Sequence, residues 1–151
     1  MQASLKLLYS AAAALSLMAM QAPATAGPVA SEHGAVCKPY NYSNAGGLYS
    51  WVLGVSNYTN ATMAVICPIV RPAEVVDGRF DVWVSQRAGS PASTCWLYSY
   101  NWTSAFLGVS GPITGQGWLG LAQAAVPAYS YQAVYCLLPP NGNILGVSPV
   151  L

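Results

Sequence analysis

The sequence feature that most constrains the fold is the alternation in residues 129–138, Y-S-Y-Q-A-V-Y-C-L-L. Successive side chains of a β-strand point to opposite faces of the sheet, so residues two apart share a face. Tyr129, Tyr131 and Tyr135 therefore lie on one face of the expected strand, and Cys136 lies on the other. The Pro-Pro pair after Leu138 ends the strand, because proline has no amide proton to donate. The stretch predicts a strand with a cysteine side and a tyrosine side.

The N-terminal residues have the pattern of a secretory signal peptide. Lys6 is followed by an apolar run over residues 7–20 and by the small-residue motif Ala24-Thr25-Ala26, which predicts cleavage after Ala26. The apolar run is about fourteen residues, fewer than the roughly twenty that span a bilayer. An uncleaved N-terminal membrane anchor is the alternative. We expect no transmembrane anchor in the mature chain.

The expected organisation has three parts. Residues 1–26 form a helical signal peptide, residues 27–34 a flexible leader, and residues 35–151 one domain. Removing the signal peptide leaves about 125 residues, enough for one domain with its own core. The mature protein is expected to be secreted, periplasmic or on the cell surface.

The expected mature chain carries almost no charge. Its four Lys and Arg residues balance its four Asp and Glu residues, and residues 88–151 contain none of these types. Such a chain cannot bind phosphates through counterion release, so nucleic acid is excluded as a partner. A net charge near zero favours self-association, so the expected protein partners are a second copy or another exported protein.

Four cysteines remain after export, an even number in an oxidising compartment. We predict that Cys37 pairs with Cys67 and Cys95 with Cys136, because each second cysteine lies in an apolar segment that proline soon follows. The other two connectivities stay open. This pairing suggests two similar halves, each closed by its own disulfide. A zinc site is the alternative, but the chain has no C-x-x-C pair, and we expect no metal and no cofactor.

The pattern of short apolar segments separated by turn residues predicts an all-β fold, an antiparallel β-sandwich of about eight or nine short strands with two disulfides. The expected strands cover residues 35–40, 48–56, 62–70, 80–86, 93–100, 106–110, 118–122, 129–138 and 144–150. The second and third of these are expected to form a hairpin across a short polar loop. Residues 111–117 are expected to form a glycine-rich loop.

The aromatic residues beside the second predicted disulfide form the strongest candidate for a binding surface. If Cys95 and Cys136 are bonded, their strands are neighbours, and the side chains on the face away from the sulfurs gather together. These residues are Trp96, Tyr98, Tyr100, Tyr129, Tyr131 and Tyr135. Such a face can stack on sugar rings or on a partner protein. The alternatives are that it faces the core or mediates self-association. The tryptophans that could extend it are Trp51, Trp83, Trp102 and Trp118.

The sequence offers little material for catalysis. His33 is the one histidine, in the expected leader, and no G-x-S-x-G motif is present. The carboxylates that lie closest together in the sequence are Glu74, Asp77 and Asp81. We interpret this segment as a solvated turn that leads into a strand, with Asp81 ion-paired to Arg79 or Arg87. No catalytic residue is therefore predicted, and we expect that the protein is not an enzyme.

Four Asn-x-Ser/Thr sequences begin at Asn41, Asn57, Asn60 and Asn101. In a eukaryotic secretory protein they would be candidate glycosylation sites. We interpret them as turn residues, because asparagine side chains hydrogen-bond readily to nearby backbone.

Four short motifs together resemble those of a group of uncharacterised exported bacterial proteins. The motifs are Ala35-Val36-Cys37-Lys38-Pro39, Val65-Ile66-Cys67-Pro68-Ile69-Val70-Arg71, Cys95-Trp96-Leu97 and residues 131–140. The resemblance implies a bacterial two-disulfide β-sandwich. It implies no activity and no catalytic residue. The low charge of the second half departs from that group's pattern.

These features are compatible with three hypotheses for the function. The first is a non-enzymatic, secreted structural or interaction domain. The second is a carbohydrate-binding module that uses the tyrosine and tryptophan face. The third and most remote is a secreted hydrolase that uses Asp77 or Asp81. Exposure of the tyrosines separates the first two hypotheses, because full burial would remove the sugar-binding surface.

Overall fold

A computed structural model of the chain describes residues 32–41, 46–69, 78–123, 126–127 and 130–149. The predicted signal peptide and most of the predicted leader lie outside these residues, as do Glu74, Asp77 and Tyr129. Within the described ranges, no helix has the length and hydropathy needed to cross a bilayer.

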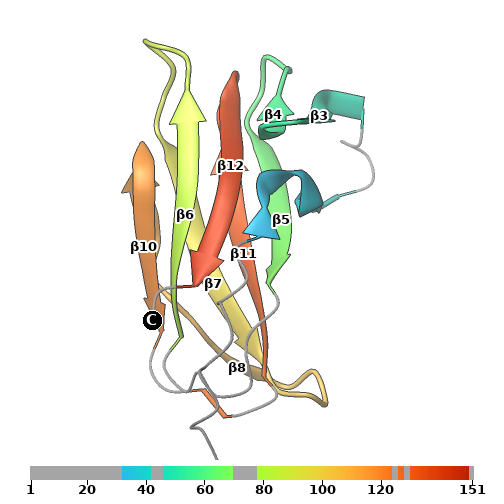
Figure 1. Ribbon diagram of the computed structural model, residues 1–151, viewed down its shortest axis with the longest axis vertical. Coiled ribbons are helices and arrows are strands. Elements are labelled where there is room, and N and C mark those ends of the chain that lie inside the picture. Colours follow the sequence, from blue (N-terminus) through green and yellow to red (C-terminus); the bar gives the residue numbers. More distant parts are fainter. Residues whose placement is uncertain (1–31, 42–45, 70–77, 124–125, 128–129, 150–151) are drawn as a thin grey trace, which may run out of the picture.

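The described residues form two antiparallel sheets packed face to face, so the predicted all-β sandwich is confirmed (Figure 1). The strands of sheet A, in spatial order, are β10 (Gly117–Gln123), β6 (Gly78–Gln86), β12 (Gly142–Pro149), β4 (Gly54–Asn57) and β3 (Leu48–Trp51), with β1 (Glu32–His33) beside β12. Those of sheet B are β2 (Lys38–Pro39), β5 (Met63–Ile69), β11 (Tyr131–Leu138), β7 (Ser93–Tyr100) and β8 (Phe106–Val109), with β9 (Ile113–Gly115) beside β7. A 3₁₀ turn, η1 (Gly34–Val36), comes directly after β1.

The core lies between the sheets and matches the alternation that the sequence shows. Three alternate residues of β6 are fully buried, namely Phe80, Val82 and Val84. Leu97 of β7 and Val134 of β11 are equally buried on the facing sheet. The intervening residues of these strands point outward, so each sheet has one apolar and one outer face.

Both predicted disulfides are present and lie in this core. Cys95 and Cys136 stand directly opposite each other in the β7–β11 register, with Cα atoms 4.1 Å apart. Cys37 pairs with Cys67, with Cα atoms 4.0 Å apart. Two disulfides are typical of proteins from an oxidising compartment.

The expectation of two similar halves, each closed on itself, is wrong. Both disulfides lie in sheet B, where β11 pairs with β5 on one side and β7 on the other. Sheet A also mixes the two halves, because β12 pairs with β4 and β6. The favoured cysteine pairing is confirmed, but the order of the strands depends on contacts distant in sequence.

The predicted strand over residues 48–56 is two strands. β3 and β4 form a tight hairpin with Val52 and Leu53 at its tip. Gly54 opens β4 with a φ of 140°, and a Cβ there would lie 2.0 Å from the carbonyl oxygen of Ile144. A glycine is therefore required where β4 meets β12. The predicted hairpin with residues 62–70 is also wrong, because β4 belongs to sheet A and β5 to sheet B.

Smaller differences concern the short elements. The strand expected over residues 35–40 is mostly η1 and the two-residue β2. The glycine-rich loop over residues 111–117 contains β9, which pairs with one end of β7. Residues 32–33, placed in the leader from the sequence, pair with β12. The described part of the chain therefore has twelve strands, several of which are only two to four residues long.

Candidate functional site

The aromatic residues predicted beside the second disulfide lie on the outer face of sheet B. Burial alternates along β7: the side chains of Cys95 and Leu97 are buried, while Trp96, Tyr98 and Tyr100 are partly exposed. β11 shows the same alternation, with Tyr131 exposed and Tyr135 partly exposed. The alternative that this face is the core-facing side is therefore wrong. Of the six predicted residues, Tyr129 lies outside the described residues.

Tyr135 is the centre of a cluster of rings on this face. Its ring lies 5.2 Å from that of Tyr40, 5.6 Å from that of Trp96 and 6.1 Å from that of Tyr98, measured between centroids. Two of these contacts are edge-to-face, an arrangement that aromatic pairs favour. β11 is the middle strand of sheet B, which places Tyr135 between rings from both neighbouring sides.

A depression of about 220 Å³ opens among these rings, lined by Tyr40, Ile66, Tyr98, Tyr100 and Tyr135. Tyr40 and Ile66 were not among the predicted site residues. The two-residue period of a strand predicts both. Tyr40 lies three positions after Cys37 and Ile66 one position before Cys67, so each points to the side opposite its cysteine, away from the core. Tyr40 is 57% exposed, and its amide donates to Ala64 O at 2.9 Å.

The face continues toward the edge of sheet B. Phe106 on β8 lies 5.8 Å from the ring of Tyr100 and 6.4 Å from that of Tyr98. Tyr131 stands opposite Tyr100 in the register and is 61% exposed. Exposed rings therefore extend from the depression in the direction of β8.

The outer face of sheet B carries almost no charge, and its central polar group is the hydroxyl of Tyr135. Burial raises the pKa of Tyr135, and the neighbouring hydroxyls of Tyr40 and Tyr98 raise it further. At neutral pH the Tyr135 hydroxyl therefore stays protonated and can both donate and accept a hydrogen bond. Apart from Lys38, the sheet B strands contain no charged residue.

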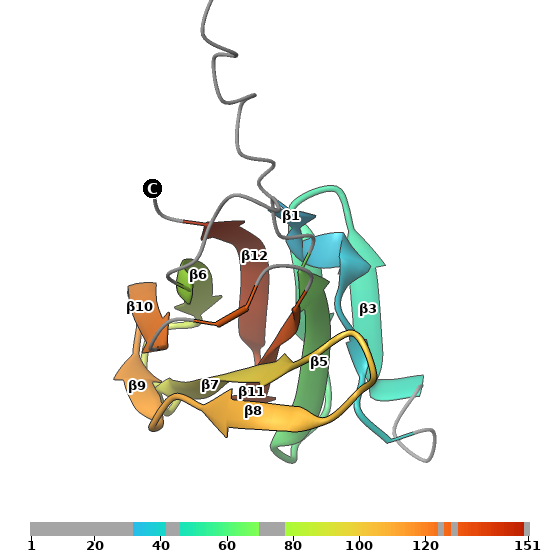
Figure 2. The same cartoon turned by 90° about the horizontal axis from the view of Figure 1, so that it is seen from below.

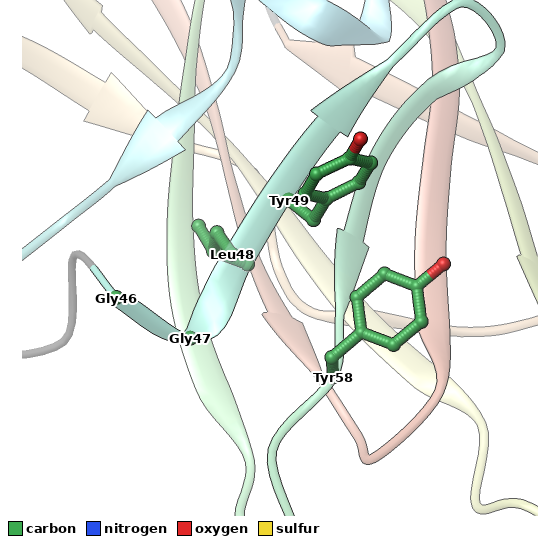
Figure 3. A pocket seen from close by; sticks show the side chains of 5 residues that line it. All are labelled: Gly46, Gly47, Leu48, Tyr49 and Tyr58. Carbon is green, nitrogen blue, oxygen red and sulfur yellow. The ribbon is translucent and has the colours of Figure 1, made fainter.

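A second opening lies beside the β3–β4 hairpin (Figure 3). It has a volume of about 440 Å³ and is lined by Gly46, Gly47, Leu48, Tyr49 and Tyr58. The two tyrosine rings lie edge-to-face with centroids 5.9 Å apart, and both are more than half exposed. Sequence reasoning did not single out either tyrosine, because neither shares a strand with a cysteine.

Three of the four remaining tryptophans, Trp51, Trp83 and Trp118, lie on sheet A and so do not extend the face around Tyr135. Trp83 and Trp118 lie on sheet A, the opposite side of the sandwich. Trp102 is 71% exposed in the turn between β7 and β8, and Trp51 is partly buried at the end of β3.

Comparisons with known proteins identify no family. No family model matches the chain, and no curated protein matches it. One similar solved structure is described as the xylan-binding module CBM15, with 14% identity, a TM-score of 0.44, and coverage of 76% of this chain and 88% of that one. The function must therefore be inferred from the geometry of the described residues.

Few of the described residues could support catalysis, and the contacts of Asp81 and His33 are structural. Asp81 lies 3.7 Å from Arg79, the ion pair expected from the sequence. His33 accepts from the Ala35 amide at 3.2 Å, and its Nε2 lies 3.0 Å from Val52 O, so the ring links η1 to the β3–β4 turn. Among the described residues, no three His, Cys, Asp or Glu side chains form a group that could hold a metal ion.

Proposed function

We propose that this chain is a non-catalytic carbohydrate-binding domain and that the outer face of sheet B binds a neutral glycan. We call this surface the tyrosine face; it consists of Tyr40, Trp96, Tyr98, Tyr100, Tyr131 and Tyr135. The observation that carries the proposal is the outward-pointing ring cluster around Tyr135 with its open depression.

The chemistry of the tyrosine face matches that of a sugar ring. A pyranose has an apolar face of C–H groups and a rim of hydroxyls, and a tyrosine offers an apolar ring with one polar hydroxyl. The depression of about 220 Å³ suits a single sugar unit, since it is smaller than the pockets of roughly 300–1,000 Å³ that bind drug-sized molecules. The exposed Tyr131 and Phe106 rings beyond it offer contacts to neighbouring units of a longer chain. The near absence of charged residues favours a neutral glycan over a charged one.

The strands that carry the tyrosine face are held in a fixed register. The Cys95–Cys136 disulfide joins the two strands that supply most of the rings, and the Cys37–Cys67 disulfide holds the segment that leads to Tyr40. A surface ordered before binding loses less conformational entropy when the ligand arrives.

A second candidate function is protein association through the edge of sheet B. β8 is the last strand of that sheet, and its Phe106, Leu107 and Val109 side chains are 57%, 39% and 44% exposed. An exposed apolar edge strand can pair with another chain. This would make the protein a structural or interaction domain that recognises a second copy or another exported protein.

A glycan array probed with the exported chain tests the proposal, together with affinity measurements on the best ligand. Tyr98→Ala and Tyr135→Ala should each weaken binding about tenfold or more, since a buried aromatic contact is worth about 1.4 kcal/mol or more. Tyr58→Ala is the matched control, because that tyrosine is exposed on a different surface. Arrays that stay blank for a folded protein would refute the proposal, and sedimentation of the same sample would then test association through β8.

A further inference from the structure

The outer face of sheet A carries a separate pair of exposed indoles. Trp83 of β6 and Trp118 of β10 stand directly opposite each other in the register. Their rings stack with centroids 5.1 Å apart and an angle of 27° between the planes. They are 44% and 57% exposed, whereas their strand neighbours Val82 and Leu119 are buried in the core. The two rings are therefore held by the sheet but are not part of the core.

Polar groups lie one row further along the same face. Asp81 stands opposite Gly120 on one side and Ser148 on the other. Arg79 Nε lies 3.7 Å from Asp81 Oδ1, which is buried and makes no hydrogen bond among the described residues. A Cβ on Gly120 would lie 3.3 Å from both Arg79 Nη2 and Asp81 Oδ1, so the glycine leaves room for this pair beside the indoles.

The size and charge of this surface suit a sugar better than a protein. Rows on one strand face repeat every two residues, about 7 Å, so a ring stacked on the indoles can bring its hydroxyls near the Asp81–Arg79 pair. That pair has no net charge and supplies both an acceptor and donors. Stable protein interfaces bury about 800 Å² per partner around an apolar centre, whereas here the apolar part is two indoles beside polar groups.

We infer that Trp83, Trp118, Asp81 and Arg79 form a second saccharide-binding site, which we call the tryptophan platform. Its ligand is a neutral pyranose unit of a polysaccharide, stacked on the indoles, with its hydroxyls bound by the carboxylate and the guanidinium group. Asp81 and Arg79 thereby have a binding role on sheet A, separate from the tyrosine face.

The position of the platform has a consequence for the whole domain. Figure 2 shows β10, β6 and β12 on one side of the sandwich and β7, β11 and β8 on the opposite side. The platform and the tyrosine face therefore point away from each other, and one domain can hold two polysaccharide chains at once. Two linked sites raise the avidity for a network of chains without any new contact. This cross-linking role rests on the function proposed for the tyrosine face.

The platform can be tested by affinity electrophoresis of residues 27–151 in gels that contain hydroxyethylcellulose, soluble xylan or galactomannan. Trp83→Ala and Trp118→Ala should each reduce the retardation constant about fivefold or more for at least one of these polysaccharides. Trp118→Phe keeps a ring and should retain part of the effect. Trp102→Ala removes a tryptophan that is more exposed, at 71%, but is not stacked on another described indole, and it should change nothing. Urea unfolding of each variant verifies that the fold is retained.

The outcomes separate the two sites. Loss of retardation only in Tyr98→Ala and Tyr135→Ala would overturn the platform and leave the tyrosine face intact. Loss only in Trp83→Ala and Trp118→Ala would overturn the tyrosine face and support the platform. Equal effects of Trp102→Ala and Trp118→Ala would also overturn the platform, and absence of retardation in all three gels for the wild-type chain would overturn both sites for these ligands.

Discussion

Asn57 links the two sheets through its side chain, and its replacement gives a quantitative test of the fold. It is the last residue of β4 in sheet A and is fully buried. The two N–H groups of its Nδ2 are shared among three carbonyl oxygens: Leu138 O at 2.9 Å and Pro139 O at 3.0 Å, at the end of β11 in sheet B, and Ala61 O at 2.8 Å. Its Oδ1 accepts from the amide and hydroxyl of Thr59 at 2.9 and 2.7 Å.

Asn57→Ala should lower the free energy of unfolding by about 4 kcal/mol. The change leaves the carbonyls of Leu138 and Pro139 without this donor, and a buried polar group without a partner costs roughly 1–3 kcal/mol. The lost contacts with Thr59 add about 1 kcal/mol, because that part of the turn can still reach water.

Asn101→Ala is the matched control. Asn101 also precedes an aromatic residue and a threonine, and its Oδ1 accepts from the amide and hydroxyl of Thr103 at 3.0 and 2.7 Å. A third bond comes from the Ala105 amide at 2.8 Å. These bonds lie at an exposed turn and link no sheets, so the expected loss is about 1 kcal/mol.

Urea unfolding monitored by circular dichroism, with both disulfides intact, measures these free energies. Asn57→Asp extends the comparison, because a carboxylate keeps the acceptor for Thr59 but cannot donate to the two carbonyl oxygens. Burial beside these oxygens would raise the pKa of the new carboxyl in the folded state above the unfolded value of about 3.9. The stability of this variant should therefore be highest below pH 4 and fall as the pH rises through the raised pKa. If Asn57→Ala and Asn101→Ala differ by less than about 1 kcal/mol, the link between the sheets is not what Asn57 provides.

Two further predictions concern the disulfides and the phenol of Tyr135. Replacing Cys95 and Cys136 by alanine should lower the free energy of unfolding by about 4 kcal/mol, because the disulfide closes a loop with a sequence separation of 41 residues. Replacing Cys37 and Cys67, which are 30 residues apart, should lower it by about 3.6 kcal/mol. Equal losses well below 2 kcal/mol in urea unfolding would contradict the loop-closure estimate. The raised pKa of Tyr135 predicts stability that is fully present below pH 10 and is lost as the pH rises through the folded-state value. Absorbance at 295 nm should show a late-titrating phenol that Tyr135→Phe removes, and superimposable titrations of the two proteins would refute this.

The sequence predicts most reliably those strands that are buried on one face only. β6, β7 and β11 alternate apolar and polar or aromatic residues, so both their extent and their facing could be predicted. The stretch over residues 48–56 could not be interpreted in this way, because apolar residues continue through the turn at Val52 and Leu53. The break depends on the φ of Gly54 and its close contact with β12, which is a tertiary constraint.

The order of the strands was beyond what local pattern can give. A hairpin between neighbouring strands is a good default, but the chain leaves sheet A after Asn57 and enters sheet B at Met63. The hydrogen bonds of Asn57 to Leu138 and Pro139 help to fix this crossing, and those partners lie 81 and 82 positions away in the sequence. No local pattern shows them.

That the tyrosines share the face opposite the disulfide could be predicted, because successive side chains of a strand alternate between its two faces. Whether that face was the core or the outside could not be predicted, because a disulfide between neighbouring strands can lie on either face of a sheet. The structure places Cys95 and Cys136 in the core and so Tyr98 and Tyr135 outside. In the same way, the alternation with Phe80 and Val82 predicts that Trp83 lies on the opposite face of its strand. It does not predict which ring stacks on Trp83. Trp118 is stacked on it because β10 pairs with β6 in one particular register, and that register depends on the whole sheet.

The outward rings of both sheets contribute little to the core, and this allows stability and binding to be separated. Val82, Leu97 and Val134 are fully buried on the opposite face of the same strands or their neighbours. Tyr131 and Trp118 remain 61% and 57% exposed, and exposed apolar groups promote association in a protein with a net charge of only +1. If these rings served the fold alone, truncating them would lower stability and leave glycan affinity unchanged. If these surfaces bind sugars, truncating the rings should have the opposite pair of effects. The free energy of unfolding should change by less than about 1 kcal/mol at such exposed positions, while retardation in polysaccharide gels decreases.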